Sequence, residues 1–245
     1  MRRIDGGYRR FLQRKLTLKP KLSELRHAIG GEFNAFGIVE REMLKFYGLQ
    51  STDRLVDVGC GAGRLVAALA GWFTGSYLGT DVVGSLIAAC RELAPLPEWK
   101  FVKVDTTTIP AAAQSVDIVC LFSVLTHLSH EDSYCYLEEA RRVLRVGGRI
   151  VFSFLEFREK SHWRIFTESV AIAKTRKTGT LNVFLSREAI EAWAMRLRLR
   201  VVDIRDGRDP FVPLPHPIAL DSGIVMEEYG FLGQAICVLE RTEPS

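Results

Sequence analysis

Three glycines at alternate positions form the most informative stretch of the sequence. Gly59, Gly61 and Gly63 follow a short apolar run and precede a helical pattern that begins at Arg64. Glycine accepts a positive φ and lets the backbone approach a ligand closely, while the first turn of a helix directs free N–H groups toward that ligand. Asp57, two residues before the first glycine, adds a carboxylate that suits a cationic group. The turn therefore predicts a site for a ligand with an amino group.

A dinucleotide-binding turn would use the same device with a different spacing. Its pattern is Gly-x-Gly-x-x-Gly, whereas Arg64 stands where the third glycine would fall. Asp81, at the end of the next apolar run, suits a ribose in either kind of site because a carboxylate can accept hydrogen bonds from both hydroxyls of a diol. The spacing and Asp57 count against an NAD(P)-dependent oxidoreductase, which is the less favoured enzyme class. A binding protein that keeps the fold without turnover is a further alternative.

The stretch Val56-Asp-Val-Gly-Cys-Gly-Ala-Gly63 resembles motif I of class I S-adenosylmethionine-dependent methyltransferases. Among them the chain resembles the small-molecule enzymes with methyltransferase domains of types 11 and 25. The likeness runs from Leu55 to about Phe154 and continues more loosely to Leu239. It implies S-adenosyl-L-methionine as the cofactor. It also implies an enzyme that transfers a methyl group to an oxygen or nitrogen atom of a small-molecule or sugar-containing acceptor.

The resemblance also implies which residues contact the cofactor. Asp81 matches the acidic residue that holds both ribose hydroxyls in that family, and Asp105 matches the residue that contacts the adenine. The segment after the fourth strand lines the methionine end of the cofactor. The implied cofactor-binding residues are Asp57, Gly59, Cys60, Gly61, Gly63, Asp81, Val82, Asp105, Thr106, Leu121 and Phe122.

His127, in the segment after the fourth strand, is the candidate catalytic residue. The family pattern places it beside the transferred methyl group, where a neutral imidazole can act as a general base for an oxygen acceptor. A wall of the acceptor pocket and a structural histidine are the alternatives. His127 and the nearby His130 lack the i, i+4 spacing of helical metal sites, although Glu131 and Asp132 follow them. We therefore predict no metal centre.

The order of apolar runs predicts the elements that position these residues. Short β-branched runs alternate with helical patterns, which is typical of a parallel sheet with crossover helices. The predicted strands are 55–58, 77–80, 100–104, 116–122, 149–154, 200–204 and 235–239. The predicted helices are 22–47, 64–70, 84–93, 130–145 and 187–197. The sequence thus predicts a doubly wound α/β fold with a seven-stranded, mostly parallel sheet and an N-terminal helical cap.

Polar and glycine residues mark the ends of these elements. Ser129 begins a capping box for the third crossover helix, and Ser186 precedes the fourth. Gly147 and Gly148 are expected to stop the third helix and to turn the chain directly into the fifth strand. Asp117, near the start of the fourth strand, is interpreted as structural.

We predict one domain over residues 1–245. Its parts are a basic arm and helical cap at 1–47, a cofactor-binding core at 48–155, and acceptor-side insertions with the last two strands at 156–245. Within the last part, residues 156–182 and 206–233 depart from the alternation and are expected to be irregular, the second because it contains four prolines. Both carry aromatic residues, which suit an acceptor wall or ordinary packing.

The charge distribution argues against a fold built to bind nucleic acid. The net charge is +4, but residues 1–27 hold nine Lys and Arg against two acidic residues, so this arm carries +7 and the rest of the chain −3. An RNA methyltransferase that grips phosphates with the arm is therefore possible but not favoured. No apolar run reaches the ~20 residues that span a bilayer. Five cysteines without a Cys-x-x-Cys pair indicate free thiols in a reducing cytoplasm; the sequence indicates no oligomeric state.

Overall fold

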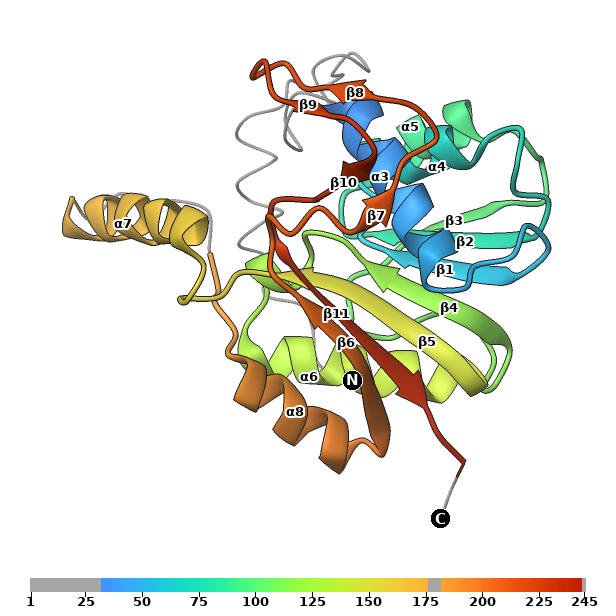
Figure 1. Ribbon diagram of the computed structural model, residues 1–245. Coiled ribbons are helices and arrows are strands. Elements are labelled where there is room, and N and C mark those ends of the chain that lie inside the picture. Colours follow the sequence, from blue (N-terminus) through green and yellow to red (C-terminus); the bar gives the residue numbers. More distant parts are fainter. Residues whose placement is uncertain (1–31, 176–181, 244–245) are drawn as a thin grey trace.

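A computed structural model describes residues 32–175 and 182–243, which fold around one seven-stranded sheet. The strands follow the order β3-β2-β1-β4-β5-β11-β6, and β11 runs antiparallel to both of its neighbours while the others are parallel (Figure 1). Their bounds are β1 Arg54–Val58, β2 Ser76–Asp81, β3 Lys100–Lys103, β4 Val116–Leu121, β5 Leu144–Phe154, β6 Leu199–Arg205 and β11 Ala235–Arg241. This topology confirms the predicted seven-stranded, mostly parallel sheet.

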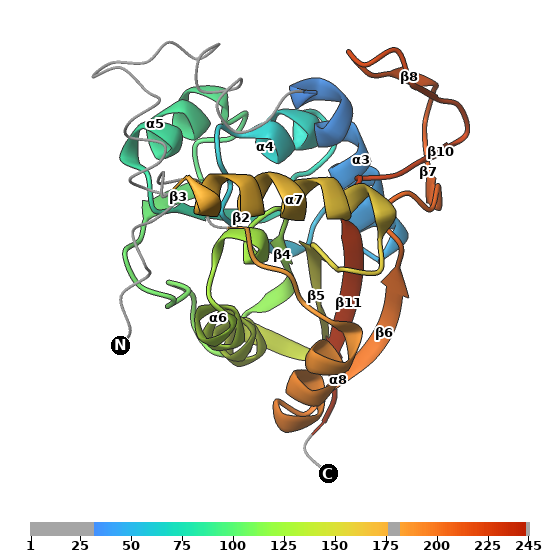
Figure 2. The ribbon, with the colours of Figure 1, turned by 90° about the vertical axis from the view of Figure 1, so that its left-hand side faces the viewer.

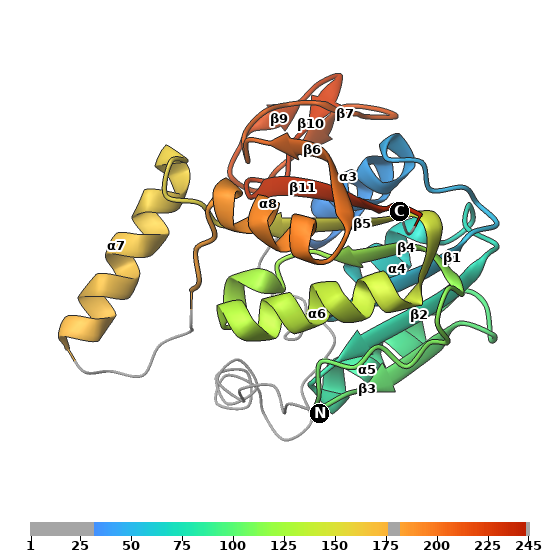
Figure 3. The same ribbon diagram turned by 90° about the horizontal axis from the view of Figure 1, so that it is seen from below.

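Helices cover both faces of the sheet, as predicted. One face carries α3 (Phe33–Phe46), α4 (Arg64–Leu69) and α5 (Gly84–Leu93), and the other carries α6 (His130–Val143) and α8 (Arg187–Arg196) (Figure 3). The central strand β4 shows why two layers form, because successive side chains of a strand point to opposite faces. Ile118 and Cys120 enter the core under α3 to α5. Val119 and Leu121 enter the core against α6 and α8.

Two serines begin the helices that they were predicted to cap. The Ser129 hydroxyl accepts a hydrogen bond from the Asp132 N–H at 3.1 Å, and the Ser186 hydroxyl accepts one from the Ala189 N–H at 3.2 Å. Each bond satisfies one of the amide groups that a helix leaves unpaired at its start. The sequence therefore located the starts of α6 and α8 correctly.

The predicted function of Gly147 and Gly148 was wrong. Helix α6 ends at Val143, and β5 already begins at Leu144, so both glycines lie inside the strand. The register between β4 and β5 shifts in this region. A Cβ on Gly148 would lie 2.9 Å from the carbonyl oxygens of Arg145 and Asp117. The glycine is needed because the irregular strand passes close to its neighbour's backbone, not because a helix stops there.

Of the two segments that were expected to be irregular, residues 156–182 contain a long helix and residues 206–233 are irregular. Helix α7 (Lys160–Lys174) occupies most of the first, so that expectation was wrong. It projects beyond the carboxyl ends of the strands (Figures 1 and 2). The second segment contains only two short antiparallel pairs, as its prolines suggested. These are β7 (Val212–Pro213) with β10 (Tyr229–Gly230), and β8 (Ile218–Ala219) with β9 (Val225–Met226).

The start of α7 is fixed by a buried histidine. His162 is 1% exposed. Its Nδ1 accepts a hydrogen bond from the Glu156 N–H at 3.0 Å, and its Nε2 lies 3.0 Å from the Gly233 carbonyl oxygen. The pattern requires a proton on Nε2, because a carbonyl oxygen can only accept. His162 thereby ties α7 to the end of β5 and to the turn before β11.

Arginine side chains bind carboxylates near the amino ends of the strands. Asp117 accepts hydrogen bonds from the Arg54 N–H and guanidinium, both at 2.8 Å, and from Arg145 at 2.5 Å. Burial raises the pKa of Asp117, but the hydrogen bonds from Arg54 and Arg145 outweigh it and hold the pKa well below its usual range. Asp117 is structural, as interpreted, and it is ion-paired.

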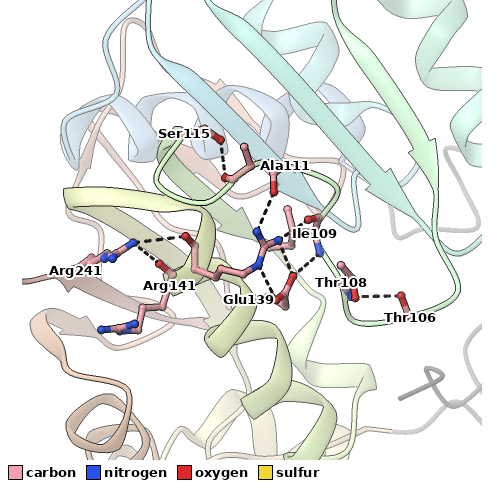
Figure 4. A network of polar contacts seen from close by, with 10 residues as sticks. Thr106, Thr108, Ile109, Ala111, Ser115, Glu139, Arg141 and Arg241 are labelled. Atoms are coloured by element: carbon pink, nitrogen blue, oxygen red, sulfur yellow. Dashed lines mark hydrogen bonds and ion pairs between the residues drawn. The ribbon is translucent and has the colours of Figure 1, made fainter. Parts of the chain in front are cut away.

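A second arginine network fixes the connection between β3 and β4 onto α6 (Figure 4). Arg142 donates two hydrogen bonds to Glu139, at 2.8 and 2.9 Å, and others to the carbonyl oxygens of Ile109 and Ala111. Arg241 donates to carbonyl groups at the end of α6. These bonds satisfy groups that the helix and the loop would otherwise leave unpaired.

The N-terminal cap is represented by α3. Helix α3 begins at Phe33, because Glu32 is its N-cap in the left-handed conformation (φ 62°), so the predicted helix at 22–47 is not continuous through Glu32. Residues 22–31 of that helix, and the whole basic arm at 1–27, lie outside the described residues. Helix α3 packs closely on α4, since a Cβ on Gly37 would lie 2.7 Å from the Arg64 carbonyl oxygen. Within residues 32–175 and 182–243, no helix has the length and apolar character needed to cross a membrane. All five cysteines are free thiols.

Candidate active site

A cavity opens at the carboxyl ends of β1, β2, β3 and β4. This is the edge at which parallel sheets of this kind bind ligands, because the strand order reverses beside β1. The residues that line it are Glu40, Asp57, Val58, Gly59, Cys60, Gly61, Arg64, Leu65, Thr80, Asp81, Val82, Val104, Asp105, Phe122, Ser123, Val124, His127, Leu128 and Tyr136.

The glycine turn forms the floor of this cavity. The N–H groups of Gly59 and Cys60 both donate to the Thr80 carbonyl oxygen, at 2.7 and 3.0 Å, which ties the turn to the end of β2. Gly59 has a φ of 73°, and a Cβ there would lie 2.5 Å from Cγ2 of Val124. Only glycine combines this conformation with such a close approach of the loop after β4.

Asp81 connects the turn to the second strand. Its carboxylate accepts hydrogen bonds from the Gly61 N–H at 3.1 Å and from the Val83 N–H at 2.8 Å. Burial raises the pKa of Asp81 to about 6, although these two N–H groups act in the opposite direction. The side chain is 5% exposed and borders the cavity. Asp81 therefore lies beside the glycine turn, where the sequence analysis expected it.

Asp57 lies beneath the turn and already has partners in the protein. The Tyr77 hydroxyl donates to it at 2.5 Å, and the Cys120 thiol lies 3.6 Å from its other oxygen. Burial raises the pKa of Asp57 to about 6, while the Tyr77 and Cys120 contacts lower it in part. The carboxylate is thus anchored from the side of the core and still borders the cavity.

The other predicted contact residues fall into two groups. Cys60, Val82, Asp105 and Phe122 line the cavity. Gly63, Thr106 and Leu121 are not among its lining residues. Gly63 is the N-cap of α4, with a φ of 85°, and the Thr106 hydroxyl accepts from the Thr108 N–H at 3.4 Å. Leu121 is fully buried in the core against α6. Its neighbour Phe122 points to the cavity because side chains alternate along the strand.

His127 borders the cavity from the short 3-10 helix Leu125–His127. His130 points elsewhere: its Nε2 lies 3.1 Å from the Phe184 carbonyl oxygen, and its ring packs edge-on against Trp193. Among the residues whose positions the structure gives, no three His, Cys, Asp or Glu side chains are grouped so that they could hold a metal ion. The structure thus brings His127, but not His130, to the predicted site.

Sequence reasoning missed two charged residues of the cavity. Glu40 reaches it from α3, and Arg64 reaches it from the first turn of α4. Arg64 Nη1 lies 3.4 Å from Glu40 Oε1. Burial raises the pKa of Glu40 to about 7, against the opposing effect of Arg64, and the charge of Asp57 adds to the rise. A sequence pattern that could have marked Glu40 is its helical face, because the residues three and four positions away on either side are uncharged: Phe36, Gly37, Met43 and Leu44.

A polar network that reaches the cavity through Ser123 was also missed. The Ser123 N–H donates to the Ser153 hydroxyl at 2.7 Å, Ser153 donates to Gln234 Oε1 at 2.7 Å, and Gln234 Nε2 donates to the Ser123 hydroxyl at 3.1 Å. Ser123 has a φ of 58°, a conformation that residues other than glycine seldom adopt outside constrained sites. The network joins the loop after β4, strand β5 and the residue that precedes β11, so no local pattern could have revealed it.

Comparison with known families identifies this arrangement. Residues 56–152, from the first strand through most of the fifth, match the family model described as a methyltransferase domain. These residues form a class I S-adenosylmethionine-dependent methyltransferase domain. Two curated relatives agree: a phthiotriol/phenolphthiotriol dimycocerosates methyltransferase of Mycobacterium leprae is 30% identical over 123 residues, and a ubiquinone biosynthesis O-methyltransferase of Cereibacter sphaeroides is 35% identical over 126. The matches cover 47% and 48% of this chain, and the chain spans less than half of each relative, 43% and 46%.

Solved structures of methyltransferases share the fold. A putative methyltransferase in complex with the Haloferax volcanii Trm112 activator superimposes with a TM-score of 0.66 at 16% identity, covering 94% of this chain and 99% of the other. Magnesium protoporphyrin IX methyltransferase from Synechocystis PCC 6803, with bound SAH, gives a TM-score of 0.58 at 13% identity, covering 97% and 95%. The shared architecture therefore extends beyond the matched residues 56–152 to the whole sheet.

The cavity of this methyltransferase domain fits S-adenosylmethionine in its chemistry. Three buried carboxyl groups, on Glu40, Asp57 and Asp81, border one cavity, and burial raises the pKa of each. A ligand with a sulfonium and an ammonium group would stabilise the ionised forms of such groups. A diol is also a suitable partner for the remaining acceptor positions of Asp81.

Proposed function

We propose that this chain transfers a methyl group from S-adenosylmethionine to an oxygen or nitrogen atom of a small-molecule acceptor, including sugar-containing ones. The observation that carries the proposal is the cavity that joins the glycine turn, the buried Asp81 and the loop with His127 at one edge of the sheet. Oxygen is the favoured acceptor atom, because one curated relative is named as an O-methyltransferase of ubiquinone biosynthesis.

Within this proposal, Asp81 holds the ribose and Asp105 the adenine. The two oxygens of Asp81 each accept one backbone N–H, and a carboxylate oxygen has a second lone pair that can accept a ribose hydroxyl. The Gly61 backbone is held in place by the same carboxylate. The side chain that binds the ribose would therefore also fix the turn against which the cofactor lies.

The cofactor supplies a methyl group that is already activated by its positive sulfur. The protein then has to align the acceptor and exclude water, and alignment can contribute ~7–11 kcal/mol in favourable cases. Phe122, Val124 and Leu128 give the cavity an apolar wall on the side of His127. His127 would accept the proton of an acceptor hydroxyl as the oxygen attacks, provided that its imidazole is neutral.

Calorimetry on one preparation with S-adenosylmethionine, S-adenosylhomocysteine, NAD and NADP tests the proposed function. The two adenosyl-sulfur ligands are expected to bind, and the two nicotinamide dinucleotides are not. If NAD or NADP binds and S-adenosylhomocysteine does not, the proposal is overturned in favour of an oxidoreductase. Binding of S-adenosylhomocysteine without methyl transfer to any member of a panel of phenols, catechols, sugar hydroxyls and amines would favour a binding protein.

A further inference from the structure

Ser123 lines the cavity at the point where the chain leaves β4. The strand order places β4 between β1, which leads into the glycine turn, and β5. Asp81 and Asp105, which the proposed function assigns to the ribose and the adenine, lie at the ends of β2 and β3, on the other side of β1. Ser123 therefore borders the part of the cavity that lies away from these two carboxylates, in the same loop as His127.

Ser123 is held in an unusual backbone conformation by hydrogen bonds to β5 and to the residue before β11. Its φ is 58°, and its N–H donates to the Ser153 hydroxyl at 2.7 Å. Gln234 Nε2 donates to the Ser123 hydroxyl oxygen at 3.1 Å. A residue other than glycine keeps such a conformation only where its surroundings hold it there. Both the backbone and the side chain of Ser123 are therefore fixed.

The direction of the hydrogen bonds around Gln234 follows from the burial of Ser153. The Ser153 side chain is 0% exposed, so its hydroxyl hydrogen needs an acceptor in the protein. Gln234 Oε1, at 2.7 Å, is that acceptor. The reversed amide would place Nε2 against Ser153 and leave this hydrogen without a partner in the core, which is unfavourable. Nε2 of Gln234 therefore faces Ser123.

The hydrogen of the Ser123 hydroxyl is consequently directed away from Gln234. A hydroxyl group has one hydrogen and two lone pairs. One lone pair of the Ser123 oxygen accepts the Gln234 amide, so the hydrogen must point elsewhere. Within residues 32–175 and 182–243, no protein group accepts it. Ser123 thus offers a hydrogen-bond donor to a ligand in the cavity.

We infer that the Ser123 hydroxyl donates a hydrogen bond to the attacking atom of the methyl acceptor and thereby selects oxygen over nitrogen, with Gln234 as its positioning residue. The inference rests on the proposed function and deepens it. A hydroxyl oxygen has two lone pairs, so one can attack the methyl carbon while the other accepts from Ser123. A neutral amine has a single lone pair, which the attack itself requires. Its N–H groups cannot accept the Ser123 hydrogen.

The transfer uses every group of an acceptor hydroxyl. One lone pair of its oxygen forms the bond to the methyl carbon, and the electron pair of the S–C bond passes to the sulfur. The hydroxyl proton goes to His127 under the proposed function, and the products are a methyl ether, a neutral thioether and a protonated imidazole. Electron density on the oxygen rises as its proton leaves, so a hydrogen bond from Ser123 strengthens during the attack.

Paired hydroxyl and amine substrates test the selection. The probes are the hydroxyl compounds of the panel and the amines that replace the methylated hydroxyl, such as aniline for phenol. Ser123→Ala is expected to lower kcat/KM for the hydroxyl compound by about ten- to hundredfold and to leave the amine within about twofold. In calorimetry, the complex with S-adenosylhomocysteine should bind phenol about two- to tenfold more weakly. Affinity for S-adenosylhomocysteine itself should not change, which also shows that the variant is folded.

Gln234→Glu reverses the direction of the Ser123 hydroxyl with little change in the shape of the side chain. At about pH 8 the new carboxylate is ionised and can only accept, so it takes the hydrogens of both Ser123 and Ser153. The Ser123 oxygen then presents lone pairs to the cavity, which suit the N–H groups of an amine. The ratio of hydroxyl to amine kcat/KM should fall by about tenfold. In the Ser123→Ala background the same substitution should not change this ratio further, because Gln234 acts through Ser123.

Ser115→Ala and Gln114→Glu are the matched controls. Both residues precede β4 at the other end of the sheet, where the Ser115 hydroxyl donates to the Ala112 carbonyl oxygen, and neither lines the cavity. Neither change should alter the ratio.

Three results would overturn the inference and leave the proposed function standing. They are equal use of hydroxyl and amine by the unaltered protein, equal losses for both in Ser123→Ala, and independent effects of the Ser123 and Gln234 substitutions. A weakened affinity of Ser123→Ala for S-adenosylhomocysteine would also overturn it, because Ser123 would then belong to the cofactor site. If the unaltered protein methylates no member of the panel, the proposed function falls and the inference with it.

Discussion

Carboxylates at the two ends of the same sheet are held in opposite ways. At the amino ends, Asp117 lies between the guanidinium groups of Arg54 and Arg145, and its pKa is lowered. At the carboxyl ends, Glu40 and Asp81 border a cavity, and burial raises the pKa of these groups to about 7 and about 6. The first arrangement supplies its own counter-ions, whereas the second leaves negative charge incompletely neutralised inside the fold.

The difference indicates which end stabilises the protein and which end binds. A carboxylate with a lowered pKa contributes to folding at neutral pH, and one with a raised pKa opposes folding there. The buried carboxylates of the cavity lower the free energy of unfolding at neutral pH. Binding of a cationic ligand offsets this loss, because the ligand favours their ionised forms. The comparison therefore predicts that changes at the carboxyl ends alter function more than stability, and that changes at the amino ends do the reverse.

The largest effect is expected at the carboxyl ends, on turnover. If His127 is the general base, His127→Ala should lower methyl transfer by ~10²–10⁴-fold while leaving S-adenosylhomocysteine affinity nearly intact. Turnover of the unaltered protein should rise with pH as the imidazole loses its proton. His130→Ala is the control, since His130 contacts Phe184 and Trp193 and does not line the cavity. An unchanged rate and pH profile in the His127 variant would make that residue structural.

Asp81→Ala should reduce S-adenosylhomocysteine affinity by ~1.5–3 kcal/mol, the scale of hydrogen bonds to a charged group. It also removes the acceptor for the Gly61 and Val83 N–H groups, so urea unfolding must accompany calorimetry to measure the loss of stability separately. Asp105→Ala is the matched comparison: its carboxylate is exposed and lies at the next strand, and a smaller loss is expected. A folded Asp81 variant with unaltered affinity would remove this residue from the cofactor site.

Asp117→Ala should show the opposite behaviour. The substitution leaves Arg54 and Arg145 without their shared acceptor, and we expect the free energy of unfolding to fall by ~1–3 kcal/mol at neutral pH. The folded-state pKa of Asp117 is lowered, so its contribution is present above the unfolded pKa and is lost as the pH falls through the folded value. Urea unfolding at several pH values measures both quantities. A large change in S-adenosylhomocysteine affinity would contradict the division between the two ends of the sheet.

The smallest expected effect is a gain in stability at the cavity. In Glu40 the pKa rises from 4.5 to about 7, so the group's favourable contribution is lost as the pH rises through about 7. Because glutamine does not ionise, the free energy of unfolding of the Glu40→Gln variant relative to the unaltered protein should rise by up to ~2 kcal/mol between about pH 5 and about pH 8. Glu42→Gln, which loses its Arg41 and Lys45 contacts, should not stabilise at either pH. A loss of stability for Glu40→Gln at pH 8 would show that Arg64 outweighs burial.

The sequence by itself determined the parts of the protein that are local. Alternating apolar runs identified all seven strands of the sheet, because a strand buried between two helical layers needs apolar residues on both faces. Ser129 and Ser186 located two helix starts through hydrogen bonds that span three residues. The glycine turn and Asp81 were placed at the cavity because parallel strands bring their carboxyl ends to one edge.

Only the tertiary structure decided the features that depend on distant contacts. The spacing of Gly147 and Gly148 suits a helix end, yet the close approach of the Asp117 backbone explains Gly148 in the observed irregular strand. Glu40 belongs to the site because α3 packs on α4. No pattern in the sequence predicts that contact between the two helices. The raised pKa values likewise arise from burial, which is a property of the assembled layers. Local patterns specify elements and turns, while packing selects which charged side chains face the same cavity.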